Sequence, residues 1–237
     1  MARSRRRAAR ARRRPAVDVD ALVERALQIV DAEGLEAVTM RRLAAEFDTG
    51  PATLYSHVSG KDELYGLIAQ RLYQEVEVPD SGPWQDVVRG WCHSQREVFR
   101  RHNDAAILCF GVLDGGEAMA QGAERLLRAM ITGGVPAQVA AWAIDALTLY
   151  VTADVYEAWL VERRIDDGSG RPAGERIMEH FEGMAGMFAA LPADRYPFVT
   201  AHVRELMHGG GDERFAFGLE TFIAGIAASA GTDGAGH

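Results

Sequence analysis

The chain has 237 residues, 48% of them apolar, and a formal net charge of −8. This length supports one large domain or two small ones with a substantial core. Its two cysteines, Cys92 and Cys109, lie too far apart for a disulfide framework or a zinc knuckle. No stretch matches a secretory signal or is apolar for long enough to span a bilayer, so we expect a cytoplasmic protein without membrane contact.

The charge is unevenly distributed along the chain. Residues 1–14, MARSRRRAARARRR, contain eight arginines and no acidic residue, so the remainder carries a formal charge of −16. A short basic arm on an acidic body is typical of a tail that contacts an anionic polymer. We therefore expect residues 1–17 to be a disordered basic arm that contacts nucleic acid; a solvated tail and a membrane-binding tail are the alternatives.

Helical periodicity dominates from Val19 onward. The first predicted helix begins at Val19, is capped by Asp18 and ends at Gly34. A second helix over residues 39–47 is followed by a brief third helix from Pro51 to about His57. A fourth helix starts after Ser59 or Gly60, with Asp62 or Glu63 completing a capping box, and extends towards Pro79.

The second part of the chain continues the helical pattern. Further helices are predicted over residues 84–101, 104–110, 117–131, 136–164, 175–190, 194–207 and 212–229. No β-strand alternation of useful length occurs. The sequence therefore predicts an all-α protein with an N-terminal helix-turn-helix domain at 18–78, a C-terminal ligand-binding and dimerisation domain at 79–230, and a disordered tail at 231–237.

The short second and third helices match a helix-turn-helix, whose second helix enters the major groove of DNA. The residues between the core positions are small, hydroxylated or cationic, which suits contacts with phosphates and base edges. We expect Leu54 to face the core and Lys61 to point back to the DNA backbone. The candidate DNA-binding residues are Thr39, Met40, Arg41, Pro51, Ala52, Thr53, Tyr55, Ser56, His57 and Lys61.

The segment LVERALQIVDAEGLEAVTMRRLAAEFDTGPATLYSHVSGKDEL resembles the DNA-binding domain of the TetR family of transcriptional repressors. Two positions depart from the family pattern: Asp48 stands where a glycine is usual in the turn, and Val58 where a phenylalanine is usual. Aspartate also visits the left-handed region, so the turn survives. WQDVVRG at 84–90 and FAFGLETFIAGI at 215–226 are similar to the start and end of the tetracycline-repressor regulatory domain.

The resemblance implies a homodimeric repressor of double-stranded operator DNA, with an effector pocket in the C-terminal domain. Tetracycline repressors read a magnesium–tetracycline chelate, but none of the residues involved is retained. The corresponding positions are Glu77, Trp91, Gln95, Cys109, Val112 and Tyr156. A thiol is a poor magnesium ligand. We therefore expect no metal, no other cofactor and no tetracycline recognition.

A pocket at these positions would have apolar walls and few polar groups, which suits a small, flat, mostly apolar organic effector. The candidate ligand-binding residues are Trp91, Gln95, Cys109, Val112, Leu126, Ala143, Leu147 and Tyr156. Apolar residues at helical spacing are also ordinary core, and that alternative stays open.

The predicted helix at 136–164 is apolar nearly all round, which requires burial on two sides and agrees with the implied dimer. The favoured function is a repressor that a small effector releases from its operator. A DNA-binding regulator without a small-molecule switch is the alternative. An all-α enzyme is a third reading, but neither a G-x-S-x-G nor an H-E-x-x-H pattern occurs.

Overall fold

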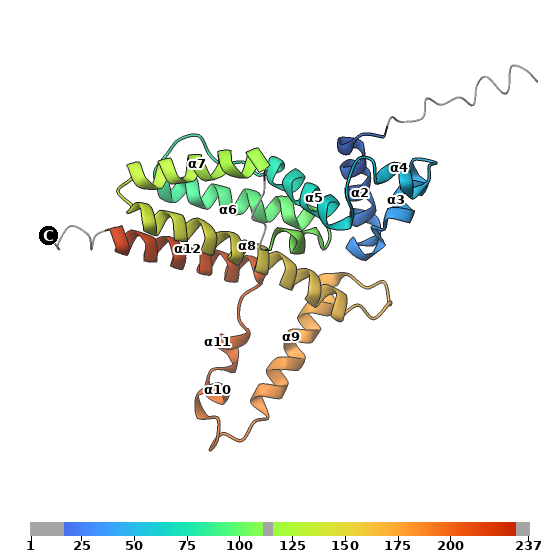
Figure 1. Ribbon diagram of the computed structural model, residues 1–237. Helices are drawn as coiled ribbons and strands as arrows, with labels where there is room; N and C mark the ends of the chain where they lie inside the picture. The colour runs from blue at the N-terminus through green and yellow to red at the C-terminus, as the bar shows by residue number, and fades with distance from the viewer. Residues whose placement is uncertain (1–16, 111–115, 231–237) are drawn as a thin grey trace, which may run out of the picture. The chain divides into compact units, whose positions relative to one another are not determined.

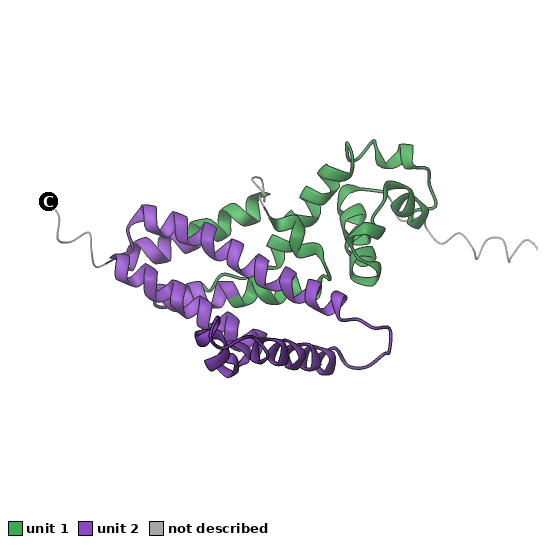
Figure 2. Cartoon of the chain, turned by 90° about the horizontal axis from the view of Figure 1, so that it is seen from below, with its two compact units in different colours: residues 1–80, 93–125 green, residues 81–92, 126–237 purple. Residues whose placement is uncertain are grey.

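The computed structural model describes residues 17–110 and 116–230. The basic arm at 1–14, the C-terminal tail and Val112 therefore lie outside the described residues. The described part is helical throughout and contains no strand, which confirms the predicted all-α class (Figure 1). It divides into two compact units, one made of residues up to 80 with 93–125, the other of 81–92 with 126–230 (Figure 2).

The first unit begins with α2 (Val19–Glu33), which packs against α3 (Met40–Glu46) and α5 (Lys61–Glu75). Asp18 caps α2 by accepting a hydrogen bond of 2.8 Å from the Ala21 N–H, as predicted. Gly34 ends the helix with φ 85°, a conformation that suits glycine. The 3-10 turn η1 (Leu35–Ala37) then leads to α3.

Apolar side chains from α2, α3, α5 and the short helix between α3 and α5 form the core of this part of the first unit. The fully or almost fully buried residues are Leu22, Ala26, Leu27, Val30, Leu43, Ala44, Leu54, Leu64, Ile68 and Leu72. α4 (Pro51–Leu54) contributes Leu54 and ends there. The helix predicted to reach about His57 is therefore shorter than expected, because residues 55–57 form a turn instead.

Two helices connect the units. α6 (Trp84–Arg101) has the predicted bounds, and α7 (Gly116–Thr132) is one residue longer at each end than the predicted helix. Between them, residues 104–110 were predicted as an α-helix, but the structure has the 3-10 turn η2 (Ala105–Cys109). Residues next to η2 form hydrogen bonds with the end of α2. These contacts between distant parts of the sequence cannot be predicted from local helical propensity.

The second unit is built around α8 (Ala137–Arg164) and α12 (Gly211–Ala230), which pack along each other. Tyr150 stacks on Phe215 with 5.4 Å between the ring centroids, and its hydroxyl donates to the Phe215 carbonyl at 3.0 Å. Gly218 faces the same tyrosine, and a Cβ there would collide with its ring. A glycine at position 218 therefore permits the close approach of the two helices.

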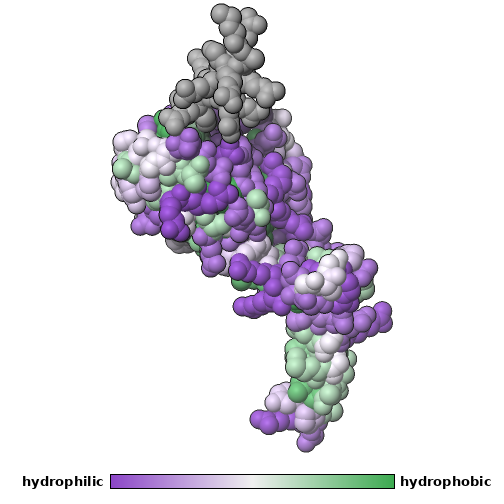
Figure 3. Space-filling view, turned by 90° about the vertical axis from the view of Figure 1, so that its right-hand side faces the viewer, coloured by the Kyte–Doolittle hydropathy of each residue, from purple (hydrophilic) through white to green (hydrophobic). Residues whose placement is uncertain are grey.

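The segment between α8 and α12 forms α9 (Ala173–Ala189), α10 (Pro197–Ala201) and α11 (Val203–Met207). A single helix was predicted over 194–207, but His202 interrupts it. None of the residues of α9 is buried within this chain. Figure 3 shows apolar surface on this lower part of the molecule, where Met178, Met187 and Phe198 are exposed.

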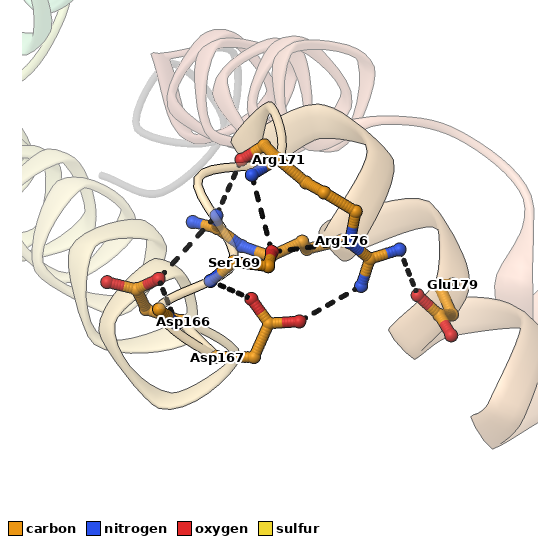
Figure 4. A network of polar contacts seen from close by, with 7 residues as sticks. Asp166, Asp167, Ser169, Arg171, Arg176 and Glu179 are labelled. Atoms are coloured by element: carbon orange, nitrogen blue, oxygen red, sulfur yellow. Dashed lines mark hydrogen bonds and ion pairs between the residues drawn. The ribbon is translucent and has the colours of Figure 1, made fainter.

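A network of side chains organises the connection from α8 to α9 (Figure 4). Arg171 bridges Asp167 at 3.1 Å and Glu179 at 3.0 Å, while Arg176 donates to the Arg171 carbonyl at 2.6 Å. Hydrogen bonds from Ser169, followed by those from Arg171, lower the pKa of the Asp167 carboxyl. The glycine-rich loop between these two helices is thus held by charged side chains.

Candidate functional site

The turn from α3 to α4 presents polar side chains around a small apolar anchor. Leu54 is fully buried and Val58 is 2% exposed, so both face the core. Tyr55, between them, is 54% exposed. The prediction that Leu54 faces the core is confirmed.

Hydrogen bonds fix the hydroxyl groups of this turn. The Thr49 hydroxyl donates to the Thr53 hydroxyl at 2.8 Å, which links the turn to α4. The Ser56 hydroxyl donates to the Thr53 carbonyl at 2.6 Å. Asp48 adopts φ 51°, so the residue that replaces the usual glycine does occupy the left-handed region.

Thr39 caps α3 by accepting a hydrogen bond of 3.1 Å from the Arg42 N–H. Arg41 is exposed. Arg42, the next residue, pairs with Glu33 at 3.0 Å and with Glu46. Of the two adjacent arginines, Arg42 is engaged in the fold and Arg41 is the one directed to solvent.

Lys61 is the first residue of α5, and its Nζ lies 4.9 Å from the centre of the Tyr65 ring. Gly60 is the N-cap, and the Ser59 N–H donates to Glu63 at 2.5 Å. Hydrogen bonds from Ser59 lower the pKa of the Glu63 carboxyl. Glu63, one of the two acidic residues considered, thus accepts from the residue before the N-cap, while the N-cap itself is a glycine that makes no side-chain hydrogen bond of a capping box.

Every candidate DNA-binding residue is exposed or half-buried within the first unit. The exposed residues are Thr39, Arg41, Pro51, Ala52, Thr53, Tyr55, Ser56 and Lys61, and the half-buried residues are Met40 and His57. All ten belong to the span from the start of α3 to the start of α5. The arrangement can offer hydroxyl, imidazole and cationic donors to a polyanion.

A second polar feature of this unit was not predicted. The turn after α6 contacts the end of α2 through three consecutive residues, His102, Asn103 and Asp104, which we call the α2 clamp. Asp104 Oδ1 accepts from the Leu35 N–H at 2.8 Å, and Asn103 Nδ2 donates to the Val30 carbonyl at 3.0 Å. The turn after the α6 helix therefore satisfies main-chain groups at the end of α2.

The α2 clamp is reinforced by charge and by burial. Asp104 is 6% exposed, and Asn103 holds φ 46°. His102 Nδ1 lies 3.0 Å from Asp31 Oδ1, and its Nε2 lies 3.6 Å from Glu75. The only sequence signal for this contact was the polar string HND after an amphipathic helix, which does not identify a partner 69 residues away.

The candidate effector residues fall in both units. In the first unit, Gln95 is fully buried and Cys109 is 4% exposed. Burial raises the pKa of the Cys109 thiol to about 12, and Cys109 is hydrogen-bonded to the Tyr73 hydroxyl. Neither amide atom of Gln95 has a hydrogen-bond partner, a feature that helical periodicity could not reveal.

In the second unit, Trp91, Leu126, Ala143 and Leu147 are buried, and Tyr156 is half-buried and stacks on Trp159 at 5.4 Å. Ala143 also lines an apolar groove of ≈ 560 Å³ along α8 and α12. Within residues 17–110 and 116–230, no three histidine, cysteine or acidic side chains gather as metal ligands. The absence of a required metal stays a prediction.

The expectation that no stretch is apolar for long enough to span a bilayer is wrong for α8, which by length and composition is the one helix of the described ranges that could cross a membrane. Only a third of its most apolar window is buried within this chain. It carries Leu147, Val151 and Val155 of the core and packs along α12, as the central helix of a soluble domain does.

Comparison with known proteins identifies both parts of the chain. Residues 22–68 match the model of the bacterial regulatory proteins of the tetR family, and residues 78–230 match the tetracyclin repressor-like C-terminal domain. The transcriptional repressor DrrR1 of Streptomyces coeruleorubidus is 30% identical over 90% of this chain and 78% of its own length. The tetracycline repressor of class D from Escherichia coli is 23% identical over 87% of this chain and 88% of its own.

Solved structures agree with these matches. The TetR family protein ActR of Streptomyces coelicolor, in complex with actinorhodin, superposes with a TM-score of 0.80 and 35% identity. The superposition covers 91% of this chain and 99% of ActR. With a helix-turn-helix that exposes its polar residues and two family models that together cover most of its length, the chain belongs to the TetR family of ligand-responsive, DNA-binding transcriptional repressors.

Proposed function

We propose that the chain binds a near-palindromic operator as a homodimer, in the cytoplasm, and that a small, mostly apolar organic effector releases it. The observation that carries the DNA-binding part is that all ten candidate residues from Thr39 to Lys61 are exposed or half-buried on an apolar core. A non-catalytic role accords with the family, whose members are transcriptional regulators.

In this proposal, residues 51–57 enter the major groove. Thr53 offers a methyl group to thymine, and Tyr55 and His57 donate to phosphates on either side. Arg41 and Lys61 add positive charge at the two ends of the same surface. Their charges matter because residues 15–77 contain only five basic residues against twelve acidic ones.

The eight arginines of residues 1–14 supply the remaining attraction to DNA. In this proposal they contact phosphates and the minor groove beside the recognition turn. Contacts of this kind strengthen operator and non-specific binding alike, since the minor groove mainly separates A·T from G·C.

The second unit, within the proposed ligand-binding and dimerisation domain at 79–230, supports a homodimer formed by α8 and α12. Trp142 on α8 is 69% exposed and Phe217 on α12 is 76% exposed. Both line the apolar groove along the two helices, together with the small residues Gly218 and Gly225. A second copy of α8 and α12 would remove these aromatic side chains from water and complete a four-helix interface.

The effector is proposed to act on residues of the C-terminal domain, with Trp91 and Gln95 on α6 as its main contacts and Cys109, Val112, Leu126, Ala143, Leu147 and Tyr156 as further candidates. The complex of ActR with actinorhodin shows that a related protein accepts an organic molecule. α6 runs directly into the α2 clamp, so a shift of this helix is expected to move Asp104 and Asn103 and with them the end of α2.

A gel-shift experiment on the DNA upstream of the chain's own gene tests this function. The intact protein should retard that duplex and not a scrambled one, and a flat organic probe should abolish the shift. Retardation that no probe reverses would favour a regulator without a small-molecule switch.

A further inference from the structure

Gln95 is a polar residue on the apolar side of α6. Its side chain is fully buried and has no hydrogen-bond partner. The helix buries Val88, Trp91, Cys92, Val98 and Phe99 along the same side, and Gln95 lies one turn after Trp91 and one turn before Phe99. Its exposed fraction is 0%, and both Nε2 and Oε1 lack a hydrogen-bond partner.

Such an arrangement is unfavourable for folding. Buried amides are nearly always paired, and an unpaired one costs the desolvation free energy of both its donor and its acceptor. An aliphatic side chain of similar volume would satisfy the apolar surroundings better. A glutamine at this position therefore needs a partner that the described residues do not supply.

We propose that Gln95 reads the effector, and that the effector is a neutral molecule with a hydrogen-bond donor next to an acceptor on a flat apolar scaffold. This inference rests on the proposed effector-regulated function. A primary amide offers N–H and C=O groups side by side, and its complement is a lactam, a carboxamide or a comparable donor–acceptor pair. We infer a neutral ligand because the other candidate effector residues are all uncharged and would not balance a buried ion.

The same pairing explains how binding would alter the protein. The Gln95 side chain is fully buried in this structure, so a ligand reaches it only in a more open form. The ligand forms hydrogen bonds with the Gln95 amide only in this more open form. Binding therefore shifts the population of the protein towards the open form. Gln95 precedes His102 of the α2 clamp by seven residues, about two helical turns, so opening at Gln95 acts on the segment that holds α2.

The test uses two probes that differ in a single donor: phenanthridin-6(5H)-one, a planar lactam, and its N-methyl derivative. Affinities are measured by quenching of tryptophan fluorescence with the full-length wild type, Gln95→Leu and Gln95→Met. Gln85→Leu, on the same helix and half-buried, is the matched control. Thermal unfolding of each ligand-free variant is measured alongside.

The wild type and Gln85→Leu are expected to bind the lactam at least tenfold more tightly than its N-methyl derivative. In Gln95→Leu and Gln95→Met the ratio of the two affinities should fall at least tenfold, because neither side chain can pair with the lactam. Comparing both probes on the wild type and on each variant isolates this pairing from other effects of the substitution. Ligand-free Gln95→Leu should unfold at the same temperature as the wild type or higher. A preference retained without the amide, a wild type that does not bind the lactam, or a clear loss of stability in Gln95→Leu would overturn the inference.

Operator release separates this inference from the proposed function. If the N-methyl derivative binds and releases the wild type and Gln95→Leu from the operator equally, effector regulation stands and the role of Gln95 is wrong. If the lactam binds through Gln95 but leaves the protein on its operator, Gln95 is a ligand-reading residue and the release mechanism is wrong.

Discussion

The buried carboxylate of Asp104 accepts a 2.8 Å hydrogen bond from the Leu35 N–H, joining two residues that lie 69 positions apart. Leu35 also receives a hydrogen bond from the Tyr65 hydroxyl on its carbonyl, at 3.3 Å. The turn after α2 is thus held from two sides, by Asp104, which directly precedes η2, and by Tyr65 of α5. This contact links the segment after α6 to the DNA-binding helices.

Replacement of Asp104 by alanine removes the acceptor and leaves the Leu35 N–H unpaired in a partly buried place. The free energy of unfolding is expected to fall by about 1–3 kcal/mol, and operator affinity should fall because α2 is less firmly positioned. Asp104→Asn keeps an acceptor oxygen and should retain most of both. Chemical denaturation and DNA titration measure the two effects.

Asp80→Ala is the control for this prediction. Its carboxylate pairs with Arg125 at 2.9 Å but is 86% exposed, so its loss should change stability by no more than about 0.5 kcal/mol. Equal effects of Asp104→Ala and Asp80→Ala would show that the α2 clamp does not position the DNA-binding helices.

The DNA surface makes a prediction that does not require knowledge of the effector. Tyr55→Ala and Lys61→Ala should each weaken operator binding, while circular dichroism and dimerisation stay normal, because both side chains are exposed. Lys61→Ala should weaken all sequences about equally and reduce the salt slope by about one unit. Gln28→Ala, exposed on α2, serves as the control, and its affinity should equal that of the wild type.

Deletion of residues 1–14 removes eight positive charges from a chain whose remainder carries −16. Operator and non-specific affinity should fall together, and the log–log salt slope should decrease by several units, at roughly 0.9 for each phosphate that the arm no longer neutralises. The ratio of the two affinities should change much less. A truncated protein that keeps the full salt slope would indicate that the arm does not touch DNA in the complex.

The proposed dimer face predicts that Phe217→Glu yields monomers. A carboxylate in the centre of the apolar α8–α12 groove would have to be buried without a partner on association. Light scattering after size exclusion measures the mass, and circular dichroism checks the helices. Ile131→Glu places the same charge at an exposed apolar position of α7, outside that groove, and should leave the dimer intact.

The two thiols should be unreactive in the folded protein. Burial raises the pKa of Cys92 and of Cys109 to about 12, so both remain protonated in the native state. Unfolded cysteines ionise near pH 9, and the folded state therefore loses stability as the pH rises from about 9 towards 12. Alkylation by iodoacetamide at about pH 8, followed by mass spectrometry, should be slow before unfolding and fast after it.

The sequence predicted the helices well where the local pattern determines them. Asp18 caps the helix that it was expected to cap, and α6 has the predicted bounds, since capping and apolar periodicity act over a few residues. Helices that depend on distant contacts were less predictable. The α4 helix ends at Leu54, and η2 replaces an α-helix next to the α2 clamp.

The exposure of the candidate DNA-binding residues was predictable. The apolar pattern of the sequence identifies Leu54 as the core position, and most residues around it are exposed. The α2 clamp and the unpaired amide of Gln95 were not predictable in the same way. Both depend on which main-chain or side-chain groups meet in space, and polar residues at such positions look in sequence like any other half-exposed helix residue.

The most direct test of the central claim is a fluorescence-anisotropy titration of the full chain on a duplex from upstream of its own gene, against a scrambled duplex, at fixed salt. The wild type should prefer the upstream duplex by about 10³-fold or more. Tyr55→Ala should lose most of that preference, and a bound organic effector should abolish it in the wild type. Equal binding of the two duplexes by the wild type, or a preference unchanged by Tyr55→Ala, would contradict a repressor that reads its operator through the turn from Pro51 to His57.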